Sequence, residues 1–176
     1  MSGGRSFTDA PVFVKHRVEH AAAVPVLRSL NKALFGFIVH SSSGNVVCYE
    51  AVRGRDGLLD VEVYWMLADP AHGVAWRRKY GHDREELSIP ERMRAYGATV
   101  RNRTADSLRM TIASVPEKVI TVKLKGGKAR AMVTLNGRQC ILDTISVRLA
   151  GILGRGTITV TGRGKDKKVV REVIEK

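Results

Sequence analysis

The residues that come nearest to a catalytic arrangement are two histidines and a glutamate close to the N-terminus. His16, Glu19 and His20 fit the H-x-x-E-H pattern, which on a helix places both imidazoles on one face, where they could bind zinc with Glu19 as the general base. A zinc site also needs a third ligand from a distant segment, and matches to five-residue patterns arise often by chance. We therefore interpret these residues as an exposed polar face and expect no metal or other cofactor.

Other enzyme signatures are missing from the sequence. It contains neither a G-x-S-x-G nucleophile motif nor a phosphate-binding G-x-x-x-x-G-K-[ST] loop. The carboxylates of Asp83, Glu85, Glu86 and Glu91 gather around one predicted loop and helix, but the sequence does not place them in a pocket, as acid–base catalysis requires. The sequence therefore favours a non-enzymatic protein.

Positive charge is concentrated in the second half of the chain, whose overall formal net charge is +13. Residues 1–88 carry 11 lysines and arginines against 10 acidic residues, whereas residues 89–176 carry 19 against 7. Such an asymmetry favours a polyanionic partner; the alternative is a basic surface that only improves solubility.

These cations alternate with apolar residues along predicted strands, so they should share one outer surface. The predicted surface consists of Arg101, Arg103, Arg109, Lys123, Lys125, Lys128, Arg130, Arg163, Lys165, Lys167 and Lys168. After Ile89 the only aromatic residue is Tyr96, so the surface lacks an aromatic platform for single-stranded bases. An acidic protein surface and a nucleic-acid backbone are both suitable partners, and binding should weaken with salt.

The elements that would present this charge are strands. Residues 60–67 place β-branched and aromatic residues at alternate positions, which predicts a strand with the core around Trp65 and cover on both faces. Residues 34–41 and 45–52 predict two strands before it. A short helix should begin after Ser88, with Pro90 in its first turn, and end at Gly97.

Downstream of this helix the chain reads as short strands with regular turns. The predicted strands are residues 99–104, 107–114, 118–125, 128–136, 139–149, 156–162 and 168–174, and residues 115–117 are predicted as a break. Gly126-Gly127 and Asn136-Gly137 are typical of two-residue hairpin turns. Connections too short for crossover helices predict a mainly β fold, an antiparallel β-barrel of the up-and-down calycin (lipocalin-like) type or a sandwich. The chain thus divides into an N-terminal arm with a helical segment, residues 1–33, and a β domain, residues 34–176.

The cysteines and the absence of targeting signals give some indication of the cellular compartment. Cys48 and Cys140 lie in predicted strands outside any C-x-x-C motif, as is typical of buried thiols in a reducing compartment. No apolar run approaches the roughly 20 residues of a membrane helix, and the N-terminus has no secretory signal. We expect a cytoplasmic location, which includes the cytoskeleton. An amphipathic mitochondrial leader stays open because the arm is basic, although Asp9 and Glu19 argue against it.

Four short motifs occur in a fixed order along the first half of this domain. They are Leu34-Phe35-x-x-Ile38, Asn45-x-Val47-x-Tyr49-Glu50, Val61-x-Val63-Tyr64-Trp65-Met66 and Arg92-x-x-Ala95-Tyr96-Gly97. In this order the chain resembles a small uncharacterised β-rich family of bacteria and some eukaryotes that is known only as a domain of unknown function. The resemblance covers residues 34–174 and implies a compact β-rich domain, without an activity or catalytic residues.

The leading functional hypothesis is a rigid module that docks through its basic surface on an acidic partner in a larger assembly, such as a microtubule or a ribonucleoprotein. One alternative is a protein that binds the backbone of RNA or DNA. Another is a carrier that holds a small apolar ligand inside the barrel near Tyr64 and Trp65, where Ala129 and Ala131 leave room.

Overall fold

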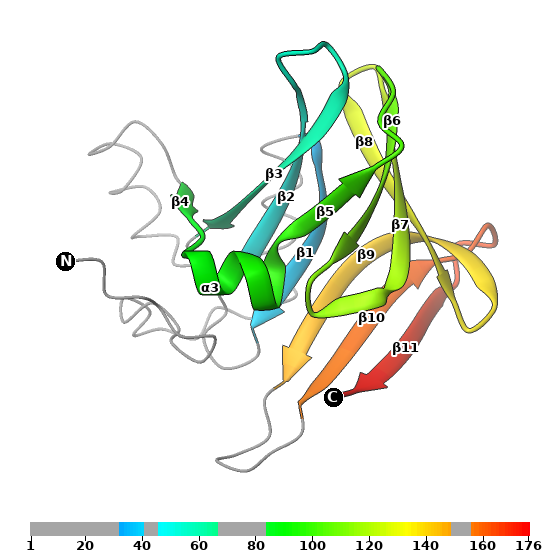
Figure 1. The fold of residues 1–176 in the computed structure, drawn as a ribbon. Coiled ribbons are helices and arrows are strands. Elements are labelled where there is room, and N and C mark those ends of the chain that lie inside the picture. Colours follow the sequence, from blue (N-terminus) through cyan, green and yellow to red (C-terminus); the bar gives the residue numbers. More distant parts are fainter. Residues whose placement is uncertain (1–31, 41–45, 67–83, 149–155) are drawn as a thin grey trace, which may run out of the picture.

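The computed structural model describes residues 32–40, 46–66, 84–148 and 156–176. Within these ranges the chain forms β-strands and one short helical segment (Figure 1). Residues 1–31 of the predicted N-terminal arm, with His16, Glu19 and His20, lie outside them, as does the predicted turn at residues 41–45. In the described part, no helix combines the length and the apolar character needed to cross a bilayer.

All the strands predicted from alternation are present, with their ends shifted by a few residues. The strands are β1 (Leu34–His40), β2 (Val46–Arg53), β3 (Leu59–Met66), β4 (Arg84–Glu86), β5 (Ala98–Arg101), β6 (Ser107–Ile112), β7 (Val115–Lys125), β8 (Lys128–Leu135), β9 (Arg138–Arg148), β10 (Thr157–Arg163) and β11 (Val169–Glu175). Only the very short β4 was not predicted.

The strands form two sheets that share β9 and whose pairings are antiparallel except for that of β1 with β9. The path runs β4-β3-β2-β1-β9-β8-β7-β6-β5, and β10 and β11 extend from the other edge of β9. In Figure 1, β9 sweeps between the two sheets. The predicted fold class, a mainly β barrel or sandwich, is confirmed. The two sheets do not close into a barrel and form an open arrangement. A strict up-and-down barrel would not contain the parallel pair that β1 makes with β9, where Ile38 lies opposite Ile145.

Both predicted hairpin turns are confirmed. The φ angles are 57° and 72° at Gly126 and Gly127, and 47° and 75° at Asn136 and Gly137. Positive φ at both central residues is the conformation of a type I′ turn, which matches the twist of the flanking strands. The predicted break at residues 115–117 was wrong, because β7 already begins at Val115; the irregularity there is a shift in the β6–β7 register.

The predicted helix is present as one turn of α-helix, α3 (Ile89–Glu91), followed by a π-helical turn, η1 (Arg92–Tyr96). Ser88 is the N-cap: its hydroxyl accepts from the Glu91 backbone N–H, and the Glu91 carboxylate accepts from the Ser88 N–H at 2.8 Å. A Cβ atom on Gly97 would lie 1.9 Å from the Arg92 carbonyl oxygen, so only glycine can end this turn.

The core is built around Trp65, as predicted. Its ring meets that of Tyr96 nearly at right angles, with centroids 5.2 Å apart, a favoured aromatic geometry. On the opposite face of the same sheet Cys48, Tyr64 and Met66 are also buried, so β3 is covered on both sides at its C-terminal end. Cys48 and Cys140 are both buried free thiols, as the sequence indicated.

Candidate functional site

Most of the predicted cations lie on the outer face of strands β5 to β8. The set here termed the basic face consists of Arg101, Arg109, Lys123, Lys125, Lys128 and Arg130, all exposed. Strand register places its members directly opposite one another in pairs, which are Arg101–Arg109, Lys123–Arg130 and Lys125–Lys128. Cross-strand neighbours share one side of a sheet, so the six charges project the same way.

This arrangement is unfavourable for the isolated fold. Like charges directly opposite each other destabilise a sheet. The ion pairs of the described residues involve other side chains, and no side chain of the basic face has an ion-pair or hydrogen-bond partner among those residues. The basic face therefore carries concentrated positive charge that no carboxylate of the described residues neutralises.

Arg103 was predicted to join this surface, and the structure corrects that prediction. Its Nε donates to the Leu59 carbonyl at 2.8 Å, and its terminal nitrogens lie 2.9 Å from an Asp56 carboxylate oxygen and 3.4 Å from one of Asp60. Strict alternation would put it on the same face as Arg101. Asn102, with φ of 50°, turns the backbone between them and sends Arg103 toward β3 instead.

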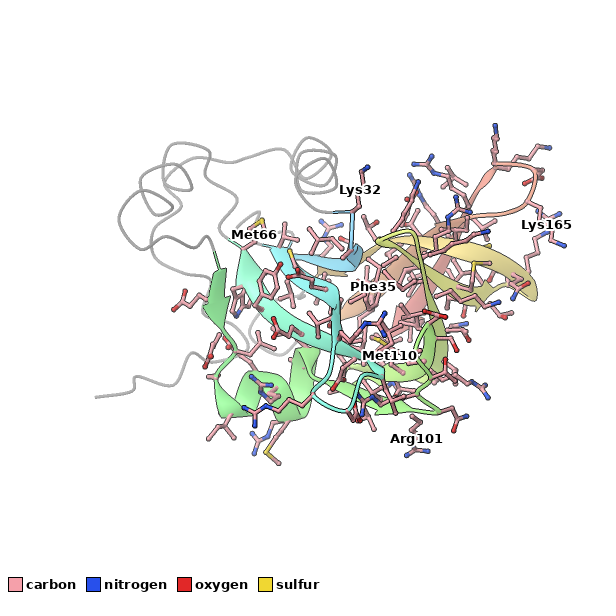
Figure 2. The ribbon with its side chains drawn as sticks, turned by 90° about the horizontal axis from the view of Figure 1, so that it is seen from above. Lys32, Phe35, Met66, Arg101, Met110 and Lys165 are labelled. Carbon is pink, nitrogen blue, oxygen red and sulfur yellow. The ribbon has the colours of Figure 1, made fainter. Side chains whose placement is uncertain are left out.

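The remaining predicted cations form a separate group at the β10–β11 connection. Arg163 donates from Nε to an Asp143 carboxylate oxygen at 2.9 Å, so its charge is partly balanced. Lys165, Lys167 and Lys168 are exposed in the loop itself. Figure 2 shows Arg101 and Lys165 projecting from well-separated parts of the molecule, so the predicted cations do not form one compact patch.

A hollow lies where one edge of β9 changes its partner strand from β8 to β1, and we term this hollow the fork. Along one edge β9 pairs with β8 as far as Ile141 and with β1 only from Ile145 onward. The hollow between the three strands has a volume of about 570 Å³. Ala129 and Ala131, predicted to leave room inside a barrel, border this hollow.

A bulge in β1 shapes one wall of the fork. The register of β1 on β2 shifts between Phe35 and Phe37, and Gly36 has a left-handed φ of 57°. Phe35 and Ile38 are three positions apart, so in a regular strand their side chains would point to opposite faces. Because the bulge adds one residue between them, both side chains pack in the core. A Cβ atom on Gly36 would lie 3.0 Å from a Leu142 methyl group, a tight approach. Sequence reasoning missed the fork, and a lone glycine inside a strand was the one local signal for it.

Tyr64 and Trp65, predicted to line one cavity, point to opposite faces of β3. The Trp65 ring is packed in the core, and its Nε1 donates to a Glu91 carboxylate oxygen at 3.3 Å. The Tyr64 hydroxyl donates to a Glu50 carboxylate oxygen at 2.8 Å, and its ring borders a second hollow, beside Glu62. They therefore do not share a ligand cavity.

Glu91 is a charged group in the core, with only 2% of its surface exposed. One carboxylate oxygen accepts from the Ser88 N–H and from Trp65, and within the described residues the other has no hydrogen-bond partner. Burial, and then the nearby Glu91 charge, raise the pKa of Tyr96. Tyr49 donates its hydroxyl to the Tyr96 carbonyl at 2.7 Å. These contacts tie the helical turn to the core, which makes Glu91 a structural residue.

The described residues contain no candidate metal site. In residues 32–40, 46–66, 84–148 and 156–176, no group of three or more histidine, cysteine or acidic side chains could hold a metal ion. The weak zinc candidates His16, Glu19 and His20 lie outside these ranges.

Comparison with known proteins gives a family but no activity. A family model described as a domain of unknown function (DUF4833) matches residues 37–176. No curated protein and no solved structure matches the chain.

Proposed function

This chain belongs to the DUF4833 family of domains of unknown function, and we propose that it is a non-enzymatic binding module whose basic face docks on an acidic protein surface in a larger assembly. The observation that carries the proposal is the set of exposed like-charge pairs on β5 to β8, whose side chains have no ion-pair partner among the described residues. An anionic surface laid against them would offset their mutual repulsion. The proposed setting is cytoplasmic, on a filament such as a microtubule or in a ribonucleoprotein particle.

The chemistry of the basic face favours a protein partner over single-stranded nucleic acid. Strands β5 to β8 contain no aromatic residue, so bases would find nothing on which to stack. The cations are long and flexible, and they sit on a regular sheet, which suits carboxylates spread over an acidic surface. Contact with the backbone of a duplex would use the same charges and is the main alternative outcome of the test.

The test compares two triple variants with the same change in net charge. Lys123→Glu, Lys125→Glu and Arg130→Glu reverse the basic face, whereas Arg55→Glu, Arg94→Glu and Arg171→Glu reverse exposed arginines elsewhere. Binding is measured by co-sedimentation with purified microtubules and by fluorescence anisotropy with a short duplex RNA. We expect microtubule binding by the wild type that weakens with salt, is lost in the first variant and is kept in the second.

Other outcomes would change the conclusion. Equal loss in both variants would mean that only net charge matters, and the basic face would have no specific role. Binding to the duplex RNA alone, abolished by the first variant, would replace the acidic protein surface with a nucleic-acid backbone. Absence of binding to either probe, together with no nuclease-resistant, salt-sensitive partner in a lysate of the source cell, would reject the docking proposal.

A further inference from the structure

The fork is bordered by strand edges that have no ladder partner on their facing side within the described part of the chain. Residues 142–144 of β9 pair with neither β8 nor β1, residues 129–131 of β8 have no partner in β9, and residues 34–37 of β1 precede its first pair with β9. The Ala129 N–H donates across this gap to the Lys32 carbonyl at 3.0 Å. Backbone polar groups need partners, so edges of this kind favour a polar occupant.

The charge around the fork is strongly one-sided. The cations that line it are Lys32, Lys125, Lys128 and Arg130. The one carboxylate in the described lining is that of Asp143, which already accepts from Arg163 at 2.9 Å. None of the four cations has an ion-pair partner among the described residues. An anion placed here would therefore meet several free positive charges at once.

The floor of the fork is apolar. Phe35, Ala131 and Leu142 border it, and each exposes less than a twentieth of its surface. Figure 2 shows Lys32 projecting outward at the start of β1, whereas Phe35 lies toward the interior. Small side chains at positions 129 and 131 keep the space open. The hollow thus offers a cationic rim over a hydrocarbon floor.

We propose that the fork binds a small organic anion with an apolar portion, whose carboxylate or phosphate lies among Lys32, Lys128 and Arg130 while its hydrocarbon part covers Phe35 and Leu142. The volume of about 570 Å³ lies in the range of about 300–1,000 Å³ typical of small-molecule sites. A purely apolar ligand would leave the rim unneutralised, and a bare inorganic anion would leave the floor wet. An amphipathic anion matches both.

This inference does not depend on the docking function, although the two sites share three cations. Lys32 lines the fork but is not part of the basic face, whereas Arg109 and Lys123 belong to the basic face but do not line the fork. Variants at Lys32 and at Arg109 with Lys123 therefore separate the two proposals. Either one can fail while the other stands.

The experiment uses the full chain and the fluorescent amphipathic anion 8-anilinonaphthalene-1-sulfonate. We expect saturable binding at one site, with displacement by octanoate or octyl phosphate. Acetate, which lacks a tail, and 1-octanol, which lacks a charge, should displace the dye far less at equal concentration. The variant Lys32→Glu, which leaves the basic face intact, should weaken dye binding several-fold, and the double variant Lys32→Glu, Lys128→Glu should weaken it about tenfold or more, since each reversal turns an attraction into a repulsion.

Two controls keep the result interpretable. Lys165→Glu with Lys167→Glu makes the same charge change in the β10–β11 loop and should leave dye binding within about twofold of the wild type. Arg109→Glu with Lys123→Glu should also keep dye binding. The proposal is overturned if the fork variant binds like the wild type, if acetate or 1-octanol displaces the dye as well as octanoate does, or if binding does not saturate.

Discussion

The basic face and the junction between β3 and β5 use arginine in opposite ways. At the junction, the Arg103 guanidinium is held by the Leu59 carbonyl and two carboxylates, and 25% of its side chain is exposed. On the basic face Arg101, only two positions earlier, is exposed and has no ion-pair partner among the residues that the structure describes. The contrast indicates that a cation in this fold is structural when a carboxylate from another strand reaches it, and is available for a partner when none does.

The largest expected effect comes from breaking the junction. Arg103→Ala removes several hydrogen bonds that join two strand pairs and leaves the Leu59 carbonyl without its donor, so we expect a loss of about 1–3 kcal/mol in the free energy of unfolding. The matched change Arg101→Ala should alter it by less than about 0.5 kcal/mol. Urea denaturation measures both, and similar losses in the two variants would abolish the distinction between structural and free arginines.

A smaller effect of opposite sign is expected on the basic face. Arg130→Glu replaces a like-charge pair with an ion pair opposite Lys123, which should raise the free energy of unfolding by about 0.5–1 kcal/mol at low salt. The gain should shrink as salt is added, because the pair is exposed. Arg171→Glu, which lies opposite Thr161, makes the same charge change without a facing cation and serves as the control. If Arg130→Glu lowered the free energy of unfolding, the repulsion between Lys123 and Arg130 would not destabilise the wild type.

The smallest effect concerns the ion pair between Lys118 and Glu172. The Lys118 ammonium, and then the Asn136 backbone N–H, lower the pKa of Glu172 below its ordinary value of 4.5. Because the folded pKa is the lower one, this contribution to stability is complete above the unfolded pKa and is lost as pH falls through the folded pKa.

Glu172→Gln tests this sign. The wild type should exceed the variant in the free energy of unfolding by a few tenths of a kcal/mol near neutral pH, and the difference should disappear as the pH falls well below 4.5. Denaturation curves over that range provide the measurement. A difference that stays constant with pH would mean that the carboxylate charge contributes nothing.

Local pattern was enough to predict most of the fold. Period-2 alternation predicted that the apolar residues of strand 107–114 face away from its cations, and Leu108 and Met110 of this strand are buried in the core. The Asn136-Gly137 turn could be predicted locally, because these two residue types readily adopt the positive φ angles that a type I′ hairpin turn needs. Glu91 was noticed only as a carboxylate beside a loop, because its contact with Trp65 joins residues that are distant in the chain.

The features that escaped sequence reasoning depend on single backbone angles or on long-range pairing. Arg103 was misplaced because the left-handed conformation of Asn102 interrupts alternation. The fork follows from the parallel pairing of β1 with β9, for which neither strand carries a local signal. β4, Arg84–Glu86, is too short to show a period. Charge composition favoured an anionic partner. It did not show which cations form ion pairs within the fold, as Arg103 and Arg163 do.

The sharing of β9 between the two sheets has a consequence for how the chain is made. Ile38 pairs with Ile145, so β1 emerges from the ribosome long before its partner in β9 does. Contacts of such high sequence separation slow folding, and unpaired strand edges on an incomplete chain are prone to aggregate. The hairpins β5–β6 and β7–β8 can form as they emerge, whereas β1 to β3 must wait with one edge open. Newly synthesised β1 to β3 are therefore the segment for which we expect the greatest need for chaperones.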